Sequence, residues 1–413
     1  MKKVLVATVL IVAAGALVGV AAVPGARAAR PLLDAGGPDR GALLTDVPDA
    51  AVRISPADGA TDVRPDTPVD VAVLDGRLVA VEVRPVGAVG TPGAGTGPGA
   101  ATADTVTGAL SADGTRWTSS AALALGTRYE VTATVRSAHG PATARSSFTT
   151  LTPTARLGPI VSPGDDAVTG VAQVVRVQFR APVTDRAAVE KRLAVTSRPS
   201  VEGGWRWVSD HEVRWRPRSF WPAHTAVEVE AALEGVDAGG GVWGERNIHV
   251  SFRIGDAQVS YVDVRTHKMV VTRDGAPVKT FDQSAGADRY PTQNGTHVVL
   301  EKMQKVVMDS ATVGIPRNSP DGYLTTTFWN VRISNSGEFV HGAPWSVDSQ
   351  GRANVSHGCV NLAPADAEWF FNFSRPGDAV VVTGSTRPPS TTDAGTADWN
   401  TPWDQWLAGS ALR

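Results

Sequence analysis

ISPADGATDVRPDTPVDVAV, residues 54–73, and VSPGDDAVTGVAQVVRVQF, residues 161–179, are two versions of one pattern, and they decide the fold of most of the chain. Two later pairs of segments keep the same order: 116–135 with 214–233, and 146–150 with 250–254. The chain therefore contains two copies of one module in series. The offset between the copies drifts because the first carries VGAVGTPGAGTGPGAA, residues 86–101, a low-complexity loop that we expect to be flexible.

Each copy carries the alternation of a half-buried strand. In the first copy, Val69, Val71 and Val73 place apolar side chains at every second position. About 100 residues per copy, with frequent turn residues, are typical of an immunoglobulin-like sandwich. We therefore predict two such domains, residues 51–152 and 153–254.

Neither copy shows a metal-binding or catalytic pattern. The histidines of the two copies, among them His224, lack the spacing of metal ligands. A set of aromatic side chains in the second copy is assigned to the core and rim of the sandwich rather than to a carbohydrate-binding face: Trp205, Trp207, Trp215, Phe220 and Trp221.

The composition is that of an ordinary globular chain rich in turns. Of 413 residues, 42% are apolar and 19% are charged, and the formal net charge is −2. This balance offers no strongly basic surface, so we expect no nucleic-acid partner. With 42 glycines and 28 prolines, long helices are disfavoured and a mainly β fold is favoured.

The first 30 residues have the features of an export segment. Two lysines precede an uncharged stretch at residues 4–25, and the triplet from Ala26 to Ala28 follows it as a plausible cleavage site. The stretch is longer than a secretory core of about 7–15 residues and reaches the length of about 20 residues that a membrane helix needs. We expect an extracytoplasmic protein of the cell envelope, anchored in the membrane by this segment, with a cleaved signal as the alternative. Residues 31–50 read as a disordered linker.

Cys359 is the only cysteine of the chain. Structural cysteines in an oxidising compartment come in pairs, so an unpaired one is a link between chains, a small buried side chain or a reactive thiol. Its neighbours favour the reactive thiol. Cys359 lies in NVSHGCVNL, residues 354–362, directly after His357-Gly358, and a second His-Gly pair precedes it at His341.

The chain from residue 255 to 385 reads as a third domain that is mostly β. The Asp274-Gly275 pair between two apolar runs predicts a hairpin. Pro364 begins the one main helix, which ends before the turn at residues 375–377. Further strands are expected at residues 295–301, 338–341 and 379–383.

Residues 386–413 form a C-terminal tail rich in tryptophan. Trp399, Trp403 and Trp406 have spacings that can share one face of a helix. We expect the tail to pack back on the sandwich. The predicted fold class is therefore mainly β: two tandem immunoglobulin-like sandwiches, a β-rich third domain with one main helix, and the tail.

The motif of the third domain resembles that of a known enzyme family. FVHGAPWS, residues 339–346, and SHGCVNL, residues 356–362, combine a strand ending in His-Gly with a downstream Ser-His-Gly-Cys and an asparagine two residues further on. This combination closely resembles the L,D-transpeptidases of the bacterial cell wall. VVMDSATVGIP, residues 306–316, and the two modules extend the resemblance over nearly the whole chain after the export segment.

The resemblance implies a cysteine acyltransferase with an L,D-transpeptidase catalytic domain. Cys359 would be the nucleophile, and His341 the base that activates the thiol and later protonates the leaving amine. Because no acidic residue lies beside His341, we expect the Gly342 carbonyl to hold its second nitrogen. His357 would support the cysteine loop, and the N–H groups of Gly358 and Cys359 would form the oxyanion hole.

Further residues are implied to bind substrate. Tyr323 and Met308 would line the acyl-donor pocket, Trp345 would belong to its lid, and Ser356 and Asn361 would fix the loop or contact substrate. One position departs from the family pattern: Val313 stands where many members carry a second tyrosine, which alters one substrate channel but not the catalytic centre.

The implied reaction joins two peptidoglycan stem peptides. Cys359 would attack a tetrapeptide stem after its third residue, a diamino acid, release D-alanine, and pass the acyl group to the side-chain amine of a second stem as a 3→3 cross-link. Carbapenem β-lactams would inhibit the enzyme, and no metal or organic cofactor is needed, since thiolate, base and oxyanion donors suffice. Two alternatives stay open: an L,D-carboxypeptidase type of cysteine hydrolase, which uses water as acceptor, and a non-catalytic cell-wall-binding protein.

Overall fold

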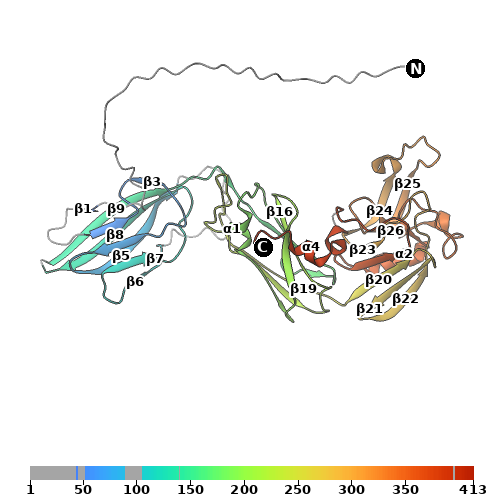
Figure 1. The fold of residues 1–413 in the computed structure, drawn as a ribbon, viewed down its shortest axis with the longest axis horizontal. Helices are drawn as coiled ribbons and strands as arrows, with labels where there is room; N and C mark the ends of the chain where they lie inside the picture. Colours follow the sequence, from blue (N-terminus) through green and yellow to red (C-terminus); the bar gives the residue numbers. More distant parts are fainter. Residues whose placement is uncertain (1–42, 45–51, 89–104, 139, 394–395) are drawn as a thin grey trace, which may run out of the picture. The chain divides into compact units, whose positions relative to one another are not determined.

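The computed structural model describes residues 43–44, 52–88, 105–138, 140–393 and 396–413. The expected membrane segment, the expected linker up to residue 42 and most of the low-complexity loop lie outside these residues. Within the described ranges no helix is long and apolar enough to cross a membrane. Figure 1 shows that the described chain is mainly β, with one ten-residue helix, α2, and shorter helical segments.

Two β-sheets form the first module, and they are blue to teal in Figure 1. One sheet has the order β1-β2-β4-β7-β6 and the other β3-β9-β8-β5. The strands are β1 Leu43–Leu44, β2 Val52–Ser55, β3 Ala60–Val63, β4 Asp70–Val73, β5 Arg77–Ala88, β6 Gly108–Leu110, β7 Arg116–Ser119, β8 Thr127–Ser137 and β9 Gly140–Thr150. The alternating valines Val69, Val71 and Val73 are buried in one core with Trp117 and Phe148.

The second module repeats this arrangement in two four-stranded sheets. Their orders are β11-β13-β16-β15 and β12-β19-β17-β14. In addition, β10 and β18 form a small parallel pair. The elements are β10 Ala155–Arg156, β11 Ile160–Ser162, β12 Val168–Thr169, β13 Val175–Gln178, α1 Arg186–Glu190, β14 Leu193–Arg198, β15 Gly203–Trp207, β16 Glu212–Pro217, β17 Ala226–Ala231, β18 Val242–Trp243 and β19 Ile248–Ile254.

Apart from β1 in the first module and the pair β10–β18 in the second, the two modules have the same sheet topology. In the first, β3 pairs in parallel with β9, and in the second, β12 pairs in parallel with β19. These strands come from the segments that the sequence analysis matched between the two copies. The mainly β fold class with immunoglobulin-like modules is therefore confirmed, and the internal repeat is its sequence signal.

The third domain contains a five-stranded and a four-stranded sheet. The five-stranded sheet has the order β22-β21-β20-β28-β23, and the four-stranded sheet β24-β25-β26-β27. The elements are β20 Gln258–Asp263, β21 Lys268–Arg273, β22 Ala276–Asp282, β23 Gly295–Val298, β24 Glu301–Asp309, η1 Ser310–Val313, β25 Leu324–Arg332, β26 Phe339–Gly342, η2 Pro344–Ser346, β27 Val360–Leu362, α2 Pro364–Phe373 and β28 Ala379–Thr383.

Most local expectations for this domain are confirmed. The hairpin turns at Asp274-Gly275, where both residues have positive φ, as a two-residue turn between twisted strands requires. Helix α2 begins at Pro364 and strand β28 covers 379–383. The single strand expected at 295–301 is wrong. The Val299 N–H donates to Asp378 and the Leu300 N–H to Arg332, so the chain crosses from one sheet to the other here.

The C-terminal tail packs on the second module, as expected. The Arg216 guanidinium lies 4.7–5.1 Å from the ring centres of three tryptophans: Trp399, Trp403 and Trp406. Trp406 is fully buried, and its indole N–H donates to the Gly204 carbonyl over 2.9 Å. One shared helical face does not form, because the tryptophans lie on two short helices, α3 Ala397–Asn400 and α4 Trp403–Leu407.

Candidate active site

A cavity of about 380 Å³ opens beside the ends of β26 and β27. Two regions border it: the floor, defined as strands β26 and β27, and the rim, defined as Tyr323, Trp345 and His357. The lining residues are Met308, Tyr323, Thr325, His341, Trp345, Val355, Ser356, His357, Cys359 and Asn361. The structure thus brings together at one cavity every predicted site residue that has a side chain. Gly342 and Gly358 adjoin the lining residues His341 and Cys359 in the chain.

His341 lies in the floor and is 3% exposed. Its Nδ1 is 3.0 Å from the Gly342 carbonyl oxygen, which confirms the expected contact. A carbonyl only accepts, so Nδ1 carries the proton and Nε2 keeps its lone pair for work as a base. Burial lowers the pKa of His341 to about 4, which leaves the imidazole neutral near pH 7.

The Cys359 thiol lies in a low-polarity part of the same cavity. Burial raises the pKa of Cys359 to about 12, although a backbone hydrogen bond from Phe339 acts in the other direction. The thiol donates to the Gly337 carbonyl, with Sγ 3.8 Å from the oxygen. Since burial disfavours charge on both groups, thiol and imidazole rest as a neutral pair rather than as an ion pair. The cysteine is thus not ionised in advance by the histidine.

Short hydrogen bonds fix the loop that carries Cys359. Ser356 Oγ donates to the Cys359 carbonyl over 2.6 Å and accepts the Gly358 N–H at 3.1 Å. Thr292 Oγ1 holds the Gly358 carbonyl at 2.8 Å. Gly358 has φ +122, a backbone conformation that residues with a side chain rarely adopt. The expected oxyanion role of the Gly358 N–H is therefore not ready in this structure, because Ser356 already occupies that donor.

Asn361 in the floor is linked by a hydrogen bond to η2, the segment that contains Ser346. It is 2% exposed, and its Nδ2 donates to Ser346 Oγ over 3.1 Å. Ser346 in turn donates to the Ala343 carbonyl, just after His341-Gly342. Both Ser356 and Asn361 thus hold loops in place, one of the two alternatives that the sequence left open. Each also lines the cavity, where it can meet a ligand.

His357 is exposed and contacts two tyrosine rings at tilted angles. The ring centres of Tyr290 and Tyr323 lie 4.8 and 4.9 Å from that of His357. The Tyr290 hydroxyl donates to Asp321 over 3.1 Å, which links this ring cluster to the segment before β25. Tyr290 was not found from the sequence, since no motif surrounds it. The geometry fits a supporting or ligand-contacting role for His357 better than that of a buried base.

The remaining pocket residues form a mixed border. Trp345 is 57% exposed, and its ring centre lies 6.1 Å from that of His341. Met308 and Tyr323 line the cavity as expected. Val313 is not among the lining residues, and it is 45% exposed at the end of η1. Thr325 and Val355 complete the lining and were not predicted.

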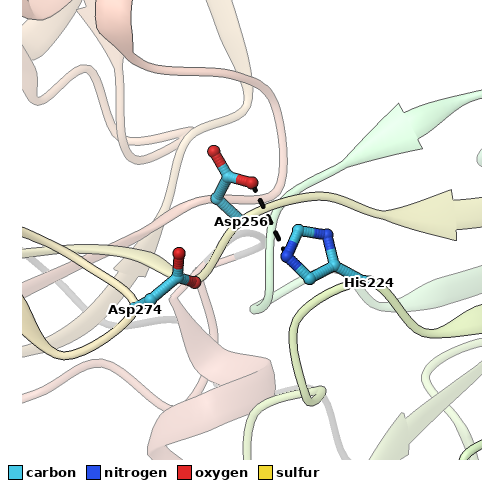
Figure 2. Close-up of side chains that lie close together, drawn as sticks. All are labelled: His224, Asp256 and Asp274. Atoms are coloured by element: carbon cyan, nitrogen blue, oxygen red, sulfur yellow. Dashed lines mark ion pairs between the residues drawn. The ribbon is translucent and has the colours of Figure 1, made fainter.

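Outside the cavity, one group in the described part of the chain has the make-up of a metal site. Figure 2 shows His224, Asp256 and Asp274 close together, with potential ligand atoms all within 4.8 Å of one another. Arg273 also lies 3.5 Å from Asp256, and the Asp274 carboxylate accepts the Ala257 N–H. His224 and Asp274 are exposed, and a neighbouring cation already serves the one half-buried carboxylate, so we assign no ion to this group.

Comparison with known proteins matches both parts of the chain. The L,D-transpeptidase catalytic domain model matches residues 257–382, and the bacterial Ig domain model matches residues 60–237. L,D-transpeptidase 2 of Mycobacterium tuberculosis (strain CDC 1551 / Oshkosh) is 40% identical over 373 residues, which are 90% of this chain and 88% of that protein. The chain belongs to the L,D-transpeptidase family. The predicted family membership is thereby confirmed.

Further members of the family show the same relation. L,D-transpeptidase 5 of Mycobacterium tuberculosis (strain ATCC 25618 / H37Rv) is 37% identical over 365 residues, which cover 86% of this chain and 76% of that protein. A solved structure of the LD transpeptidase LdtMt1 in complex with imipenem is 42% identical, with a TM-score of 0.50, over 55% of this chain and 99% of that chain. The similarity to the two curated relatives thus extends over most of the chain.

Proposed function

We propose that this L,D-transpeptidase forms 3→3 cross-links between peptidoglycan stems through a thioester on Cys359. One observation carries the proposal: the only cysteine of the chain shares a cavity with a buried histidine whose Nε2 is free. Nucleophile and base are thus present, and the base is held in the tautomer that acyl transfer needs. The donor is a tetrapeptide stem and the acceptor a second stem.

The first half of the reaction acylates Cys359. Substrate binding redirects the thiol from the Gly337 carbonyl toward His341, because in the resting structure it donates to that carbonyl. As sulfur attacks the carbonyl carbon of the third stem residue, the thiol proton passes to His341 Nε2. The C–N bond then breaks, His341 returns the proton to the departing amine, and D-alanine leaves. The backbone N–H of Cys359 is one donor to the oxyanion.

The second half transfers the acyl group to an amine. The side-chain amine of the acceptor's diamino acid attacks the thioester, and its proton passes to His341. The C–S bond breaks, His341 returns the proton to sulfur, and the neutral pair is restored. Because burial lowers the pKa of His341 to about 4, the imidazole is unprotonated near pH 7 and free to accept a proton. The rim of Tyr323, Trp345 and His357 contacts the stem peptides.

Three finer points belong to the same proposal. Carbapenems acylate Cys359 as β-lactam substrates; a relative was solved in complex with imipenem, which supports this. The export segment at residues 4–25 places the enzyme outside the cytoplasm, anchored to the membrane, and its length and flanking charges support this location. The bacterial Ig domains position the catalytic domain within reach of the cell wall.

The test is incubation of the full chain with a disaccharide-tetrapeptide, followed by mass analysis. Dimers that have lost one D-alanine are expected, and Cys359→Ala, the matched control, yields none. Tripeptides without dimers would show that water is the acceptor, as in a carboxypeptidase. Binding of the substrate with no product at all would show a cell-wall-binding protein.

A further inference from the structure

A second buried histidine faces a buried carboxylate behind the catalytic loop. His297 is fully buried on β23, and Glu338 is 4% exposed just before β26. His297 Nδ1 and Glu338 Oε2 lie 3.8 Å apart, and neither atom has a hydrogen-bond partner. This separation is within ion-pair distance but longer than a direct hydrogen bond. No other group of the described residues bonds either atom.

The hydrogen bonds around the pair determine where protons lie. His297 Nε2 is 2.8 Å from the Gln293 carbonyl, so Nε2 carries a proton and Nδ1 faces the carboxylate. Glu338 Oε1 accepts the Gln293 N–H at 2.9 Å and Arg387 at 3.1 Å. Without a further proton, two lone pairs would face each other in a buried site. One proton on either atom removes this repulsion, and at 3.8 Å the two groups then attract each other electrostatically.

The pair lies directly under the nucleophile's loop. A Cβ built on Gly358 would be 3.6 Å from Glu338 Oε1, so the carboxylate lies within van der Waals reach of this position of the loop. The residue before Glu338, Gly337, accepts the Cys359 thiol, and a charge on Glu338 raises the pKa of Cys359. The other charged groups that face Glu338 are Arg387, 41% exposed, and the more distant Asp393.

We propose that Glu338 and His297 share one proton and act as positioning residues that keep this pair behind Cys359 without net charge of its own. This inference rests on the proposed role of Cys359 as nucleophile. With the proton in place, the pair is neutral and Arg387 adds a positive charge. When the proton is lost at higher pH, an anionic Glu338 opposes the negative charge that develops on sulfur and on the substrate oxygen.

The test is the rate of Cys359 alkylation by iodoacetamide between pH 6 and 10 in the full chain. Because the chain has one cysteine, the mass change reports this residue alone. Glu338→Gln keeps the shape and cannot become anionic. Its rate should match the wild-type rate near pH 6 and exceed it about tenfold toward pH 10. His297→Gln cannot supply the proton, so its rate should fall below the wild-type rate near pH 6.

Two further variants keep the test decisive if a buried change impairs folding. Arg387→Gln removes the half-exposed cation and should slow alkylation severalfold. Glu368→Gln, on the exposed face of α2, is the matched control and should change nothing. If the ratio of the Glu338→Gln alkylation rate to the wild-type rate does not vary with pH, the proposal is overturned and Glu338 has a structural role only. If that variant does not fold, an unchanged rate in Arg387→Gln would overturn it instead.

The alkylation assay needs no stem peptide, so it separates this inference from the proposed function. If the ratio of the Glu338→Gln rate to the wild-type rate depends on pH but the stem-peptide assay yields no dimers, the shared proton is supported and the 3→3 activity is refuted. If dimers form but this ratio is constant, the 3→3 activity is supported and the shared proton is refuted.

Discussion

The floor and the rim of the cavity each present one histidine, and the two are in opposite surroundings. His341 in the floor is 3% exposed, its Nδ1 is held by a backbone carbonyl, and all residues of β26 and β27 around it are buried. His357 in the rim is exposed and contacts two tyrosine rings. One histidine has a fixed tautomer and a strongly lowered pKa, and the other has two tilted aromatic neighbours.

This difference assigns chemistry to the floor and recognition to the rim. A base needs a fixed tautomer and must release its proton readily, which burial and the Gly342 carbonyl provide at His341. A rim residue needs freedom to meet substrates that enter from solvent. Substitutions in the floor should therefore abolish acylation or lower the free energy of unfolding, whereas substitutions in the rim should weaken substrate binding.

The largest effect is expected for Cys359→Ala. Without the thiol no covalent adduct can form, so imipenem should add no mass to the variant, while the wild type should gain one drug molecule per chain. Intact-protein mass spectrometry measures both. The change removes a single sulfur atom, so the variant should unfold within ~1 kcal/mol of the wild type. An adduct on the variant would place the nucleophile elsewhere.

Low pH should slow acylation mainly by protonating His341 in the floor. Because burial lowers the pKa of His341 to about 4, the base stays neutral down to that pH, and the acylation rate should fall about tenfold per pH unit only below it. The unfolded chain binds this proton first, near pH 6.5, so stability also declines as the pH falls from about 6.5 toward 4. Rates are therefore corrected for the folded fraction by circular dichroism. A rate that halves near pH 6.5 would contradict a buried base.

A smaller effect is expected for Asn361→Ala, which cuts the link from the floor to Ser346. Loss of a buried amide that donates over 3.1 Å should lower the free energy of unfolding by about 1–3 kcal/mol, measured by urea titration. Asn372→Ala, on the exposed side of α2, is the matched control and should stay within ~0.5 kcal/mol. Equal losses in the two variants would mean that the link contributes nothing.

The smallest change in stability is expected in the rim. Trp345 is 57% exposed, so Trp345→Ala should alter the free energy of unfolding by ~0.5 kcal/mol or less. Its effect should instead be a severalfold weaker apparent affinity for the stem peptide, with the acylation rate at saturation nearly unchanged. A large loss of the saturated rate would move Trp345 from recognition to chemistry.

The sequence predicted the floor well because its signals are local. The motif around the lone cysteine resembles that of the L,D-transpeptidases, which implied that His341 is the base. With no acid beside His341, the Gly342 contact was expected, and the structure confirms it. The repeat likewise predicted the two modules. These features depend on short motifs or on strand alternation, which a chain displays without knowledge of its long-range pairing.

Features that depend on distant segments were missed. Tyr290, Thr292 and His297 come from a stretch without a motif, and they reach the site only through the folding of the two sheets. The sequence analysis assigned the Gly358 N–H to the oxyanion hole. In the structure this N–H donates to Ser356 Oγ, because a hydroxyl two residues away competes for the same donor. The prediction of one strand at 295–301 was wrong, because the alternation of apolar residues does not reveal where a chain crosses from one sheet to another.

The most direct test compares the two histidines in single-turnover acylation by imipenem. With His341 as base, His341→Ala should lose acylation nearly as completely as Cys359→Ala, by ~10³-fold or more, because nucleophile and base act as one unit. His357→Ala should lose only ~10-fold, since it supports the loop and contacts ligand from the rim. Circular dichroism of both variants establishes that they are folded. A His357→Ala variant that loses acylation while His341→Ala keeps most of it would reverse the roles of floor and rim.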